Sequence, residues 1–192
     1  MVPKPNGSWR FCIDFRRLND ATEARQWHIP NIWELLTRIG RKKYKATLDL
    51  TSGYHQAPVD PASAKYTAFK TVFGIFQWQR LAMGLKGAAP YFQEMLTTEV
   101  LVGLIHEICE LYIDDLIVFG DTPDEFIANL GKVFERLERF CVTVNPDKAK
   151  LGLDTIKYLG YELTPTGITF SKEKISQILD FPVPQTASQL KK

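Results

Sequence analysis

Two adjacent carboxylates, Asp114 and Asp115, lie between apolar, β-prone residues in the segment 110–120. An apolar run that breaks at a polar pair and resumes at once predicts a tight β-hairpin with the acids at its tip. Carboxylate oxygens fixed at such a tip are the hard ligands that a divalent cation requires. Because adjacent Asp pairs are common in protein sequences, this pair indicates a cation site only if a third acid lies in a similar setting.

Asp49 is that third acid. It ends a strand-like segment, and residues 51–53 (Thr-Ser-Gly) then interrupt the pattern. If this strand neighbours the predicted hairpin in one sheet, three carboxylates meet, and their repulsion raises their pKa values unless cations neutralise them. Two Mg²⁺ ions held by shared carboxylates activate a hydroxyl and stabilise a leaving oxygen in phosphoryl transfer. From the residues alone, a role for Asp49 as a cap at the strand end stays open.

The string Tyr112-Ile113-Asp114-Asp115, preceded by Leu-Asp-Leu-Thr-Ser-Gly-Tyr-His-Gln at 48–56, resembles the catalytic core of reverse transcriptases. The likeness is greatest to the Pol polyproteins of gypsy-type LTR retrotransposons. Further segments are similar to motifs of that family in the same order: 7–19 in the fingers, 28–32 before the next helix, 76–86 under the incoming base pair, 145–148 and 158–161 in the palm, and 181–184 at the start of the thumb or connection.

The resemblance implies an α+β fold, the fingers and palm of a right-hand polymerase, with a ferredoxin-like, split βαβ antiparallel sheet in the palm. The order strand, helix, hairpin, helix, strand from residue 45 onward also predicts this sheet and places the Asp49 strand beside the acidic hairpin. The implied domains are fingers (1–43), palm (44–65), fingers (66–82), palm (83–164) and the start of the thumb (165–192). Since the family's fingers and thumb extend beyond these limits, we expect a fragment of a longer polyprotein.

Carried over residue by residue, the resemblance implies that Asp49, Asp114 and Asp115 are catalytic and bind two Mg²⁺ ions, with Mn²⁺ as an alternative. The backbone carbonyl of Leu50 would complete the metal site.

The resemblance further implies nucleotide-binding roles for Lys4, Arg10, Ser52, Gly53, Tyr54, Met83, Gly84 and Lys148. A guanidinium such as that of Arg10 suits a triphosphate because it offers several donors and keeps its charge. Tyr54 corresponds to an aromatic gate that excludes a 2′-OH, and Lys148 or Lys150 would protonate pyrophosphate. Leu159 and Gly160 correspond to the primer grip, whereas Phe92 and Gln93 match a helix in which packing is the expected role.

The function implied is that of an RNA-directed DNA polymerase, a nucleotidyltransferase of a retrotransposon. Its expected partners are an RNA or DNA template with a primer, deoxynucleoside triphosphates, and the remaining Pol regions: RNase H, integrase and protease. Two alternatives stay open: a non-catalytic or decayed palm that only binds nucleic acid, and an RNA-directed RNA polymerase.

Composition agrees with a globular protein, since hydrophobic residues make up 45% and charged residues 24% of the 192 residues. The three cysteines, Cys12, Cys109 and Cys141, show no metal-binding spacing and predict free thiols. No apolar run approaches the roughly 18 residues of a membrane span. With no signal-peptide pattern either, we expect no membrane partner and a cytoplasmic (virus-like particle) or nuclear location, not secretion. The basic run 38–45, which includes Arg41, Lys42, Lys43 and Lys45, is either a solvated face or a phosphate contact.

Periodicity and caps predict the elements. Helices are expected at 30–39 and 88–101. A third helix should begin after Thr122, which caps it, with Glu125 completing a capping box, and a last helix should run from Ser171 to about residue 179. Strands are expected at 9–14, 66–69, 76–80, 142–144 and 157–163, in addition to the hairpin and the Asp49 strand.

Overall fold

The computed structural model describes residues 1–3, 7, 9–23 and 26–180, so Lys4 and the 181–184 motif lie outside the described residues. The helices are α1 (Arg16–Ala21), α2 (Ile32–Gly40), α3 (Pro61–Ala64), α4 (Ala88–Met95), α5 (Pro123–Arg139) and α6 (Lys172–Leu179), with 3₁₀ turns at Gly53–Gln56 and Lys65–Thr67 and a π turn at Leu96–Val100. The strands are β1 (Val2–Pro3), β2 (Trp9–Arg10), β3 (Tyr44–Asp49), β4 (Phe69–Thr71), β5 (Gly74–Phe76), β6 (Cys109–Tyr112), β7 (Asp115–Gly120), β8 (Lys150–Leu153), β9 (Ile156–Tyr158), β10 (Tyr161–Thr164) and β11 (Gly167–Phe170).

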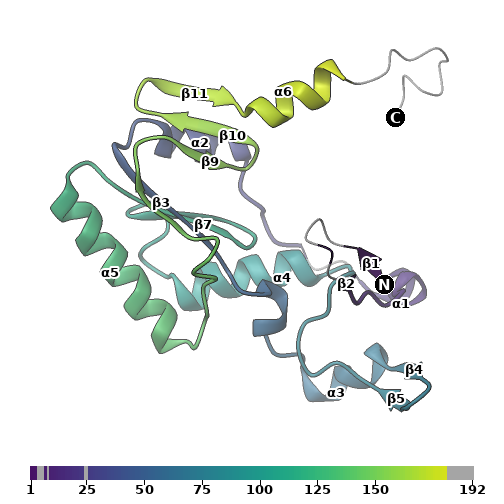
Figure 1. Cartoon of the computed structure of the whole chain (residues 1–192). Coiled ribbons are helices and arrows are strands. Elements are labelled where there is room, and N and C mark those ends of the chain that lie inside the picture. Colours follow the sequence, from purple (N-terminus) through teal and green to yellow (C-terminus); the bar gives the residue numbers. More distant parts are fainter. Residues whose placement is uncertain (4–6, 8, 24–25, 181–192) are drawn as a thin grey trace.

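A four-stranded antiparallel sheet with strand order β6-β7-β3-β8 lies at the centre of the chain. Its elements follow one another as β3-α4-β6-β7-α5-β8, which is the predicted split βαβ arrangement. Figure 1 shows α4 and α5 beside this sheet, and side chains from both helices share one core with its strands. The predicted ferredoxin-like sheet is confirmed.

The opposite face of the sheet packs on α2 and on a second sheet, β11-β10-β9. Because side chains alternate along a strand, Leu116 and Val118 of β7 join the core under α4 and α5, whereas Ile117 and Phe119 join the core under α2. Strand β7 is therefore buried on both faces, which explains its continuous apolar sequence.

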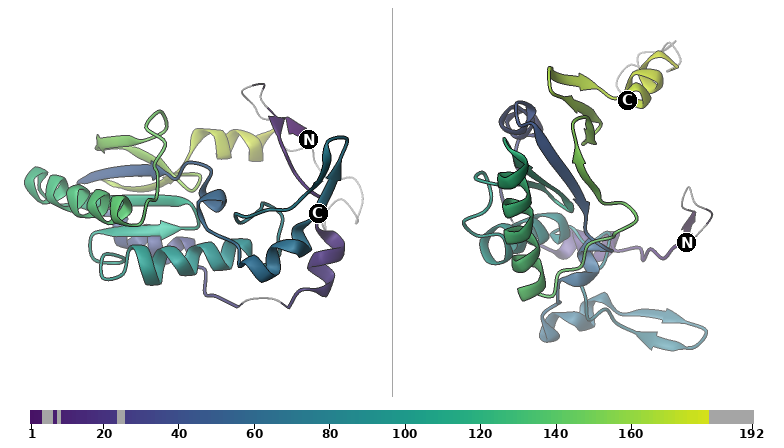
Figure 2. Two further views of the ribbon diagram at one scale, coloured as in Figure 1. Left: turned by 90° about the horizontal axis from the view of Figure 1, so that it is seen from below. Right: turned by 60° about the vertical axis from the view of Figure 1, so that its left-hand side comes forward.

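Two small hairpins, β1-β2 and β4-β5, project away from the central sheet (Figure 2). The tip of β4-β5 carries Val72 and Phe73, which are 93% and 88% exposed. Within the described residues, none of the helices combines the length and the apolarity that a membrane crossing requires.

Helix caps were well predicted. The backbone N–H of Glu125 donates to Thr122 Oγ1 over 3.2 Å, although the Glu125 carboxylate accepts from the N–H of Asp121 and not from that of Thr122. Ser171 Oγ likewise accepts from the N–H of Lys174 at the start of α6. Helix α2 begins at Ile32 and not at residue 30, because the Asn31 side chain caps it by accepting from the N–H of Trp33.

Strands that depend on distant partners were predicted less well. The strand expected at 9–14 is limited to Trp9–Arg10, because β1 offers only two residues for pairing. At 142–144 only Val144 forms an isolated bridge, and the neighbour of β3 is instead β8, a four-residue edge strand whose residues are all exposed.

The segment 157–163 is a hairpin and not one strand, since Leu159 and Gly160 have φ values of 51° and 78° and reverse the chain between β9 and β10. The pair expected at 66–69 and 76–80 is present as β4 and β5, displaced toward the tip. Phe69 is half-buried, whereas Ile75 and Phe76 are exposed, so burial periodicity could not set the limits of the pair. The helix expected at 88–101 is α4 followed by the π turn.

Candidate active site

The acidic pair lies where the sequence predicts it. Tyr112 pairs with Asp115 at the end of the β6-β7 hairpin, so Ile113 and Asp114 form a two-residue turn. Ile113 has a φ of 58°, a left-handed conformation that is costly for a β-branched residue. Such strain persists only when the surrounding structure holds it.

Asp49 is the residue of β3 that pairs directly with Asp115 of β7. The next backbone N–H, that of Leu50, donates to the carbonyl of Asp114 over 3.4 Å. These contacts bring the third acid to the tip of the hairpin, 65 residues away from it in sequence.

Burial and mutual repulsion act on these acids. The pKa of Asp115 is raised to about 6, first by burial and then by the charges of Asp114 and Asp49, while the ammonium of Lys148 lowers it. A carboxylate with a raised pKa beside two others is a site where a cation would be stabilising.

Lys148 currently supplies positive charge to Asp49. Its Nζ donates to both carboxylate oxygens of Asp49, over 3.2 and 3.1 Å. As the side chains lie, no group of three or more His, Cys, Asp or Glu residues in the described part of the chain is arranged to hold a metal ion. The donor chemistry still fits Mg²⁺, which binds through a few carboxylates together with substrate phosphates. The carbonyl of Leu50 accepts one hydrogen bond, from the N–H of Gly53, and keeps a second lone pair.

A cleft of about 410 Å³ opens beside Asp49 and Asp115. Its lining is completed by Thr47, Leu48, Asp147, Lys148, Lys150, Lys157, Tyr158 and Leu159. The structure thus brings both candidate lysines and the predicted primer-grip residue Leu159 to the acids. A slightly larger hollow, about 440 Å³, lies between α1, α3 and α4. It is mainly apolar, so we assign the chemistry to the acidic cleft.

The residues after Asp49 lie against the acidic turn. Gly53 is buried, and a Cβ atom built on it would lie 3.1 Å from the Cβ of Asp114 and 3.2 Å from the ring of Phe92. Ser52 has a φ of 51°, so the chain turns sharply here. The ring of Tyr54 packs edge-on against Phe92 with 5.4 Å between centroids, and burial together with the charge of Asp114 raises the pKa of Tyr54.

Other predicted residues lie elsewhere. Arg10 is exposed on β2, and Figure 1 shows β2 well apart from β3 and β7. Gly84 has a φ of 91°, and its carbonyl accepts from the side chain of Asn19 over 2.8 Å, while Met83 is half-buried beside it. The structure therefore does not bring Arg10 to the acids.

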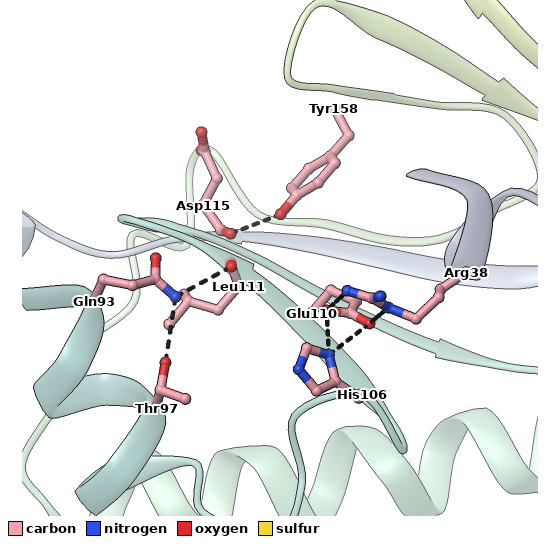
Figure 3. Close-up of polar contacts among 8 residues, drawn as sticks. All are labelled: Arg38, Gln93, Thr97, His106, Glu110, Leu111, Asp115 and Tyr158. Atoms are coloured by element: carbon pink, nitrogen blue, oxygen red, sulfur yellow. Dashed lines mark hydrogen bonds and ion pairs between the residues drawn. The ribbon is translucent and has the colours of Figure 1, made fainter. Parts of the chain in front are cut away.

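Gln93 has a role that the sequence interpretation missed. It is buried in α4, and its Oε1 accepts from the N–H of Ile113 over 2.6 Å. Its Nε2 donates to the carbonyl of Leu111 over 3.3 Å (Figure 3). The carboxamide bonds the residues on both sides of Tyr112, as the N–H and C=O of one residue in a parallel neighbouring strand would, along the edge of β6 that pairs with no strand in the described residues. A polar residue at a buried helix position was the signal available in the sequence.

Glu110, four residues before Asp114, is fully buried and was also missed. Arg38 Nε of α2 donates to its Oε1 over 2.6 Å, and His106 Nδ1 lies 2.9 Å from its Oε2 (Figure 3). This cluster fastens the base of the acidic hairpin to α2. The basic run 38–45 does not form one solvated face, since Lys45 is buried and Lys42 pairs with Asp121.

Comparison with known families gives the same picture. The sequence model described as reverse transcriptase (RNA-dependent DNA polymerase) matches residues 2–163. The chain belongs to the reverse transcriptase family. Its resemblance to this family is thereby confirmed, and reverse transcriptases are nucleotidyltransferases.

The relatives of this reverse transcriptase region include retrotransposon Pol polyproteins. The Retrovirus-related Pol polyprotein from transposon opus of Drosophila melanogaster is 39% identical over 193 residues, a match that covers 99% of this chain and 19% of that protein. The polyprotein from transposon gypsy of the same fly is 32% identical, with 93% of this chain and 17% of that protein covered. The chain therefore spans about a fifth or less of these relatives.

Solved reverse transcriptases share the fold. The foamy viral protease-reverse transcriptase dRH in complex with double-stranded DNA matches 99% of this chain and 33% of that chain, with a TM-score of 0.88 and 28% identity. The foamy viral enzyme in complex with an RNA/DNA hybrid matches 99% of this chain and 25% of that chain, with a TM-score of 0.84 and 28% identity. The predicted fingers and palm fold is confirmed.

Proposed function

We propose that this chain carries the catalytic centre of an RNA-directed DNA polymerase, which adds deoxynucleotides to a primer 3′-OH under the direction of a template. The observation that carries the proposal is the direct pairing of Asp49 with Asp115, with Asp114 in the adjoining turn. The foamy viral enzymes were solved in complex with double-stranded DNA and with an RNA/DNA hybrid, which supports nucleic-acid partners of this kind.

Asp49, Asp114, Asp115 and the carbonyl of Leu50 are the groups that would hold Mg²⁺, or Mn²⁺ in its place. Bound there, two ions would lower the pKa of the primer hydroxyl and stabilise the charge on pyrophosphate. The chain itself supplies a fixed turn, a strand register that keeps two acids together, and a lysine that neutralises Asp49 until substrate arrives. Lys148 is our choice over Lys150 as the proton donor to pyrophosphate, because its ammonium already contacts Asp49.

The residues after Asp49 would hold the nucleotide. The backbone N–H of Ser52 is suited to a phosphate oxygen, as in other glycine-containing turns. The N–H of Gly53 would do the same only after it leaves the carbonyl of Leu50, to which it donates over 3.2 Å. The ring of Tyr54, fixed against Phe92, would exclude a 2′-OH and so select deoxynucleotides.

The binding roles proposed farther from the acids rest on the resemblance to the reverse transcriptase family. Met83 and Gly84 would contact the base pair, and Arg10 and Lys4 the triphosphate. For Arg10 this requires the fingers to approach the palm, as closing lids commonly do when substrate binds. Leu159 and Gly160 would grip the primer.

The division into fingers (1–43 and 66–82), palm (44–65 and 83–164) and the start of the thumb (165–192) follows from this assignment. RNase H, integrase and protease regions of a Pol polyprotein would be its covalent neighbours, and the predicted cytoplasmic or nuclear location stays a prediction. Template and primer would be held mainly through their backbones.

Primer extension on an RNA template tests the proposal. The chain is assayed alone and extended by thumb and RNase H segments, with Mg²⁺ or Mn²⁺, and with deoxynucleotides or ribonucleotides. We expect metal-dependent extension with deoxynucleotides by the extended protein. Primer–template binding without extension would favour a non-catalytic palm, and a preference for ribonucleotides would favour an RNA polymerase.

A further inference from the structure

Tyr158 connects two sheets that share no strand pairing in the described residues. It ends β9, immediately before the turn formed by Leu159 and Gly160, and is 4% exposed. Its hydroxyl donates to the backbone carbonyl of Asp115 over 2.9 Å (Figure 3). Because β9 belongs to the β11-β10-β9 sheet and Asp115 to the central sheet, this bond links the two directly.

The 159–160 turn is stiff. Tyr158 pairs with Tyr161, and both residues between them have positive φ values, 51° and 78°. Two positive φ values in a two-residue loop are typical of the type I′ turn, whose twist matches that of its strands. The turn therefore moves with Tyr158 as one unit.

The other end of the bond lies at the strained acidic turn. Asp115 follows Asp114 directly, and the φ of 58° at Ile113 needs surrounding contacts to persist. Gln93 holds the β6 side of this turn through the N–H of Ile113, and Tyr158 holds the β7 side through the carbonyl of Asp115. Tyr158 and Leu159 also line the same cleft as Asp49 and Asp115.

We propose that Tyr158 is a positioning residue that fixes the 159–160 turn relative to Asp115. The inference rests on the proposed function, in which that turn grips the primer and Asp115 acts at the reacting phosphate. The hydroxyl of Tyr158 then sets how the primer end lies against the acids. Small displacements of reacting groups lower the rate of bond formation more than they alter nucleotide binding.

The hydroxyl could have a simpler role, which is to satisfy its own hydrogen-bonding need, since buried Tyr O–H groups usually have a partner. Tyr158→Phe separates the two roles because it keeps the ring and removes one bond. Tyr161→Phe is the matched control in the same hairpin, where the ring stacks on Phe170 at 5.2 Å.

Hydrogen exchange tests the coupling without need of activity. The N–H of Ile113 reports on the acidic turn, and the N–H of Ser171, which donates to the Gly160 carbonyl over 3.2 Å, reports on the 159–160 turn. We expect Tyr158→Phe to speed exchange at both amides about fivefold, as for loss of one hydrogen bond, and Tyr161→Phe to leave both unchanged. Unchanged exchange at Ile113 in Tyr158→Phe would overturn the proposal.

Kinetics then test positioning. In the chain extended by thumb and RNase H segments, Tyr158→Phe should lower kcat of primer extension about tenfold with KM for the deoxynucleotide unchanged. An unaltered kcat, or a rise in KM with kcat retained, would refute the positioning role. If the unsubstituted protein extends no primer, the proposed function fails, whereas hydrogen exchange still decides whether Tyr158 couples the two turns.

Discussion

Asp49 and Asp115 face each other as paired residues of β3 and β7, so the side chain of one acid is fixed relative to the other by the hydrogen-bonded ladder. Both lie on the face of the sheet that carries Ile117 and Phe119, the face that β9 also packs against. A single-residue slip of register would turn one of the acids to the opposite face. The acidic cleft therefore depends on the register between β3 and β7 along their full length.

Asp114→Asn removes one charge from the acidic turn without changing its shape. We expect primer extension to fall on the order of 1000-fold, because a ligand of the proposed metal site is lost. The free energy of unfolding should be unchanged or higher, since repulsion among the acids decreases. Asp124→Asn, an equal change on the exposed first turn of α5, is the control. Extension retained by Asp114→Asn would contradict the assignment.

Tyr54→Val shortens the proposed gate. Without the ring that packs on Phe92, space opens for a 2′-OH, and incorporation of ribonucleotides relative to deoxynucleotides should rise about 100-fold. Tyr54→Phe keeps the ring and should keep the discrimination. Competition between the two nucleotide types in one extension assay measures it, and equal discrimination by all three proteins would remove the gate role.

Gln93→Leu removes the clamp on the acidic hairpin at nearly constant volume. The N–H of Ile113 and the carbonyl of Leu111 lose their partner, so we expect a loss of about 2 kcal/mol in the free energy of unfolding. Thr97→Val removes only the 3.3 Å contact between Thr97 Oγ1 and Gln93 Nε2 and should cost much less. Denaturant unfolding of both variants provides the comparison, and equal losses would argue against the clamp.

Glu110→Gln tests the buried ion pair under the hairpin. Glu110 is 0% exposed, whereas the Arg38 side chain is 38% exposed, so the substitution removes the buried charge while the guanidinium keeps contact with solvent. We expect a loss of about 2 kcal/mol in the free energy of unfolding, the range for hydrogen bonds to charged groups. Asp121→Asn, which breaks the exposed pair with Lys42, should cost less than about 1 kcal/mol. Urea titrations that show the reverse order would contradict the ranking.

Lys45→Met concerns a buried ammonium whose Nζ lacks a hydrogen-bond partner in the described part of the chain. Burial lowers the pKa of Lys45 below 10.5, although the charge of Asp154 acts in the opposite direction. A lowered lysine pKa means that the folded state binds the proton more weakly. The free-energy cost of burying the charged lysine is therefore fully present below the pKa of the folded state. It disappears as the pH rises to the pKa of the unfolded state.

We therefore expect Lys45→Met to be more stable than the unsubstituted protein by about 1 kcal/mol at neutral pH. The difference should shrink as the pH approaches 10.5. Lys43→Met changes an exposed lysine of the same run and should show no such pH dependence. Unfolding measured across this pH range decides, and a difference that grows with pH would contradict the expected sign.

The sequence by itself determined what is local. The hairpin that carries Asp114 and Asp115, the Thr122 and Ser171 caps and the motif around Asp49 each depend on neighbouring residues, and all could be located from residue type and spacing. The exact turn, Ile113 and Asp114, came from the structure, which places Asp115 in β7. The order of elements also predicted the sheet, because few connections of strand, helix and hairpin are allowed.

Only the tertiary structure decided the contacts between distant segments. The bonds of Gln93, Tyr158 and Arg38 to the acidic hairpin, and the bond of Lys148 to Asp49, join residues 18 to 99 positions apart. Such contacts follow from strand register and core packing, which are set by the whole fold and leave no periodic trace in the sequence. The same reason explains why β8 was missed, since an exposed edge strand is defined by its partner and not by its own residues.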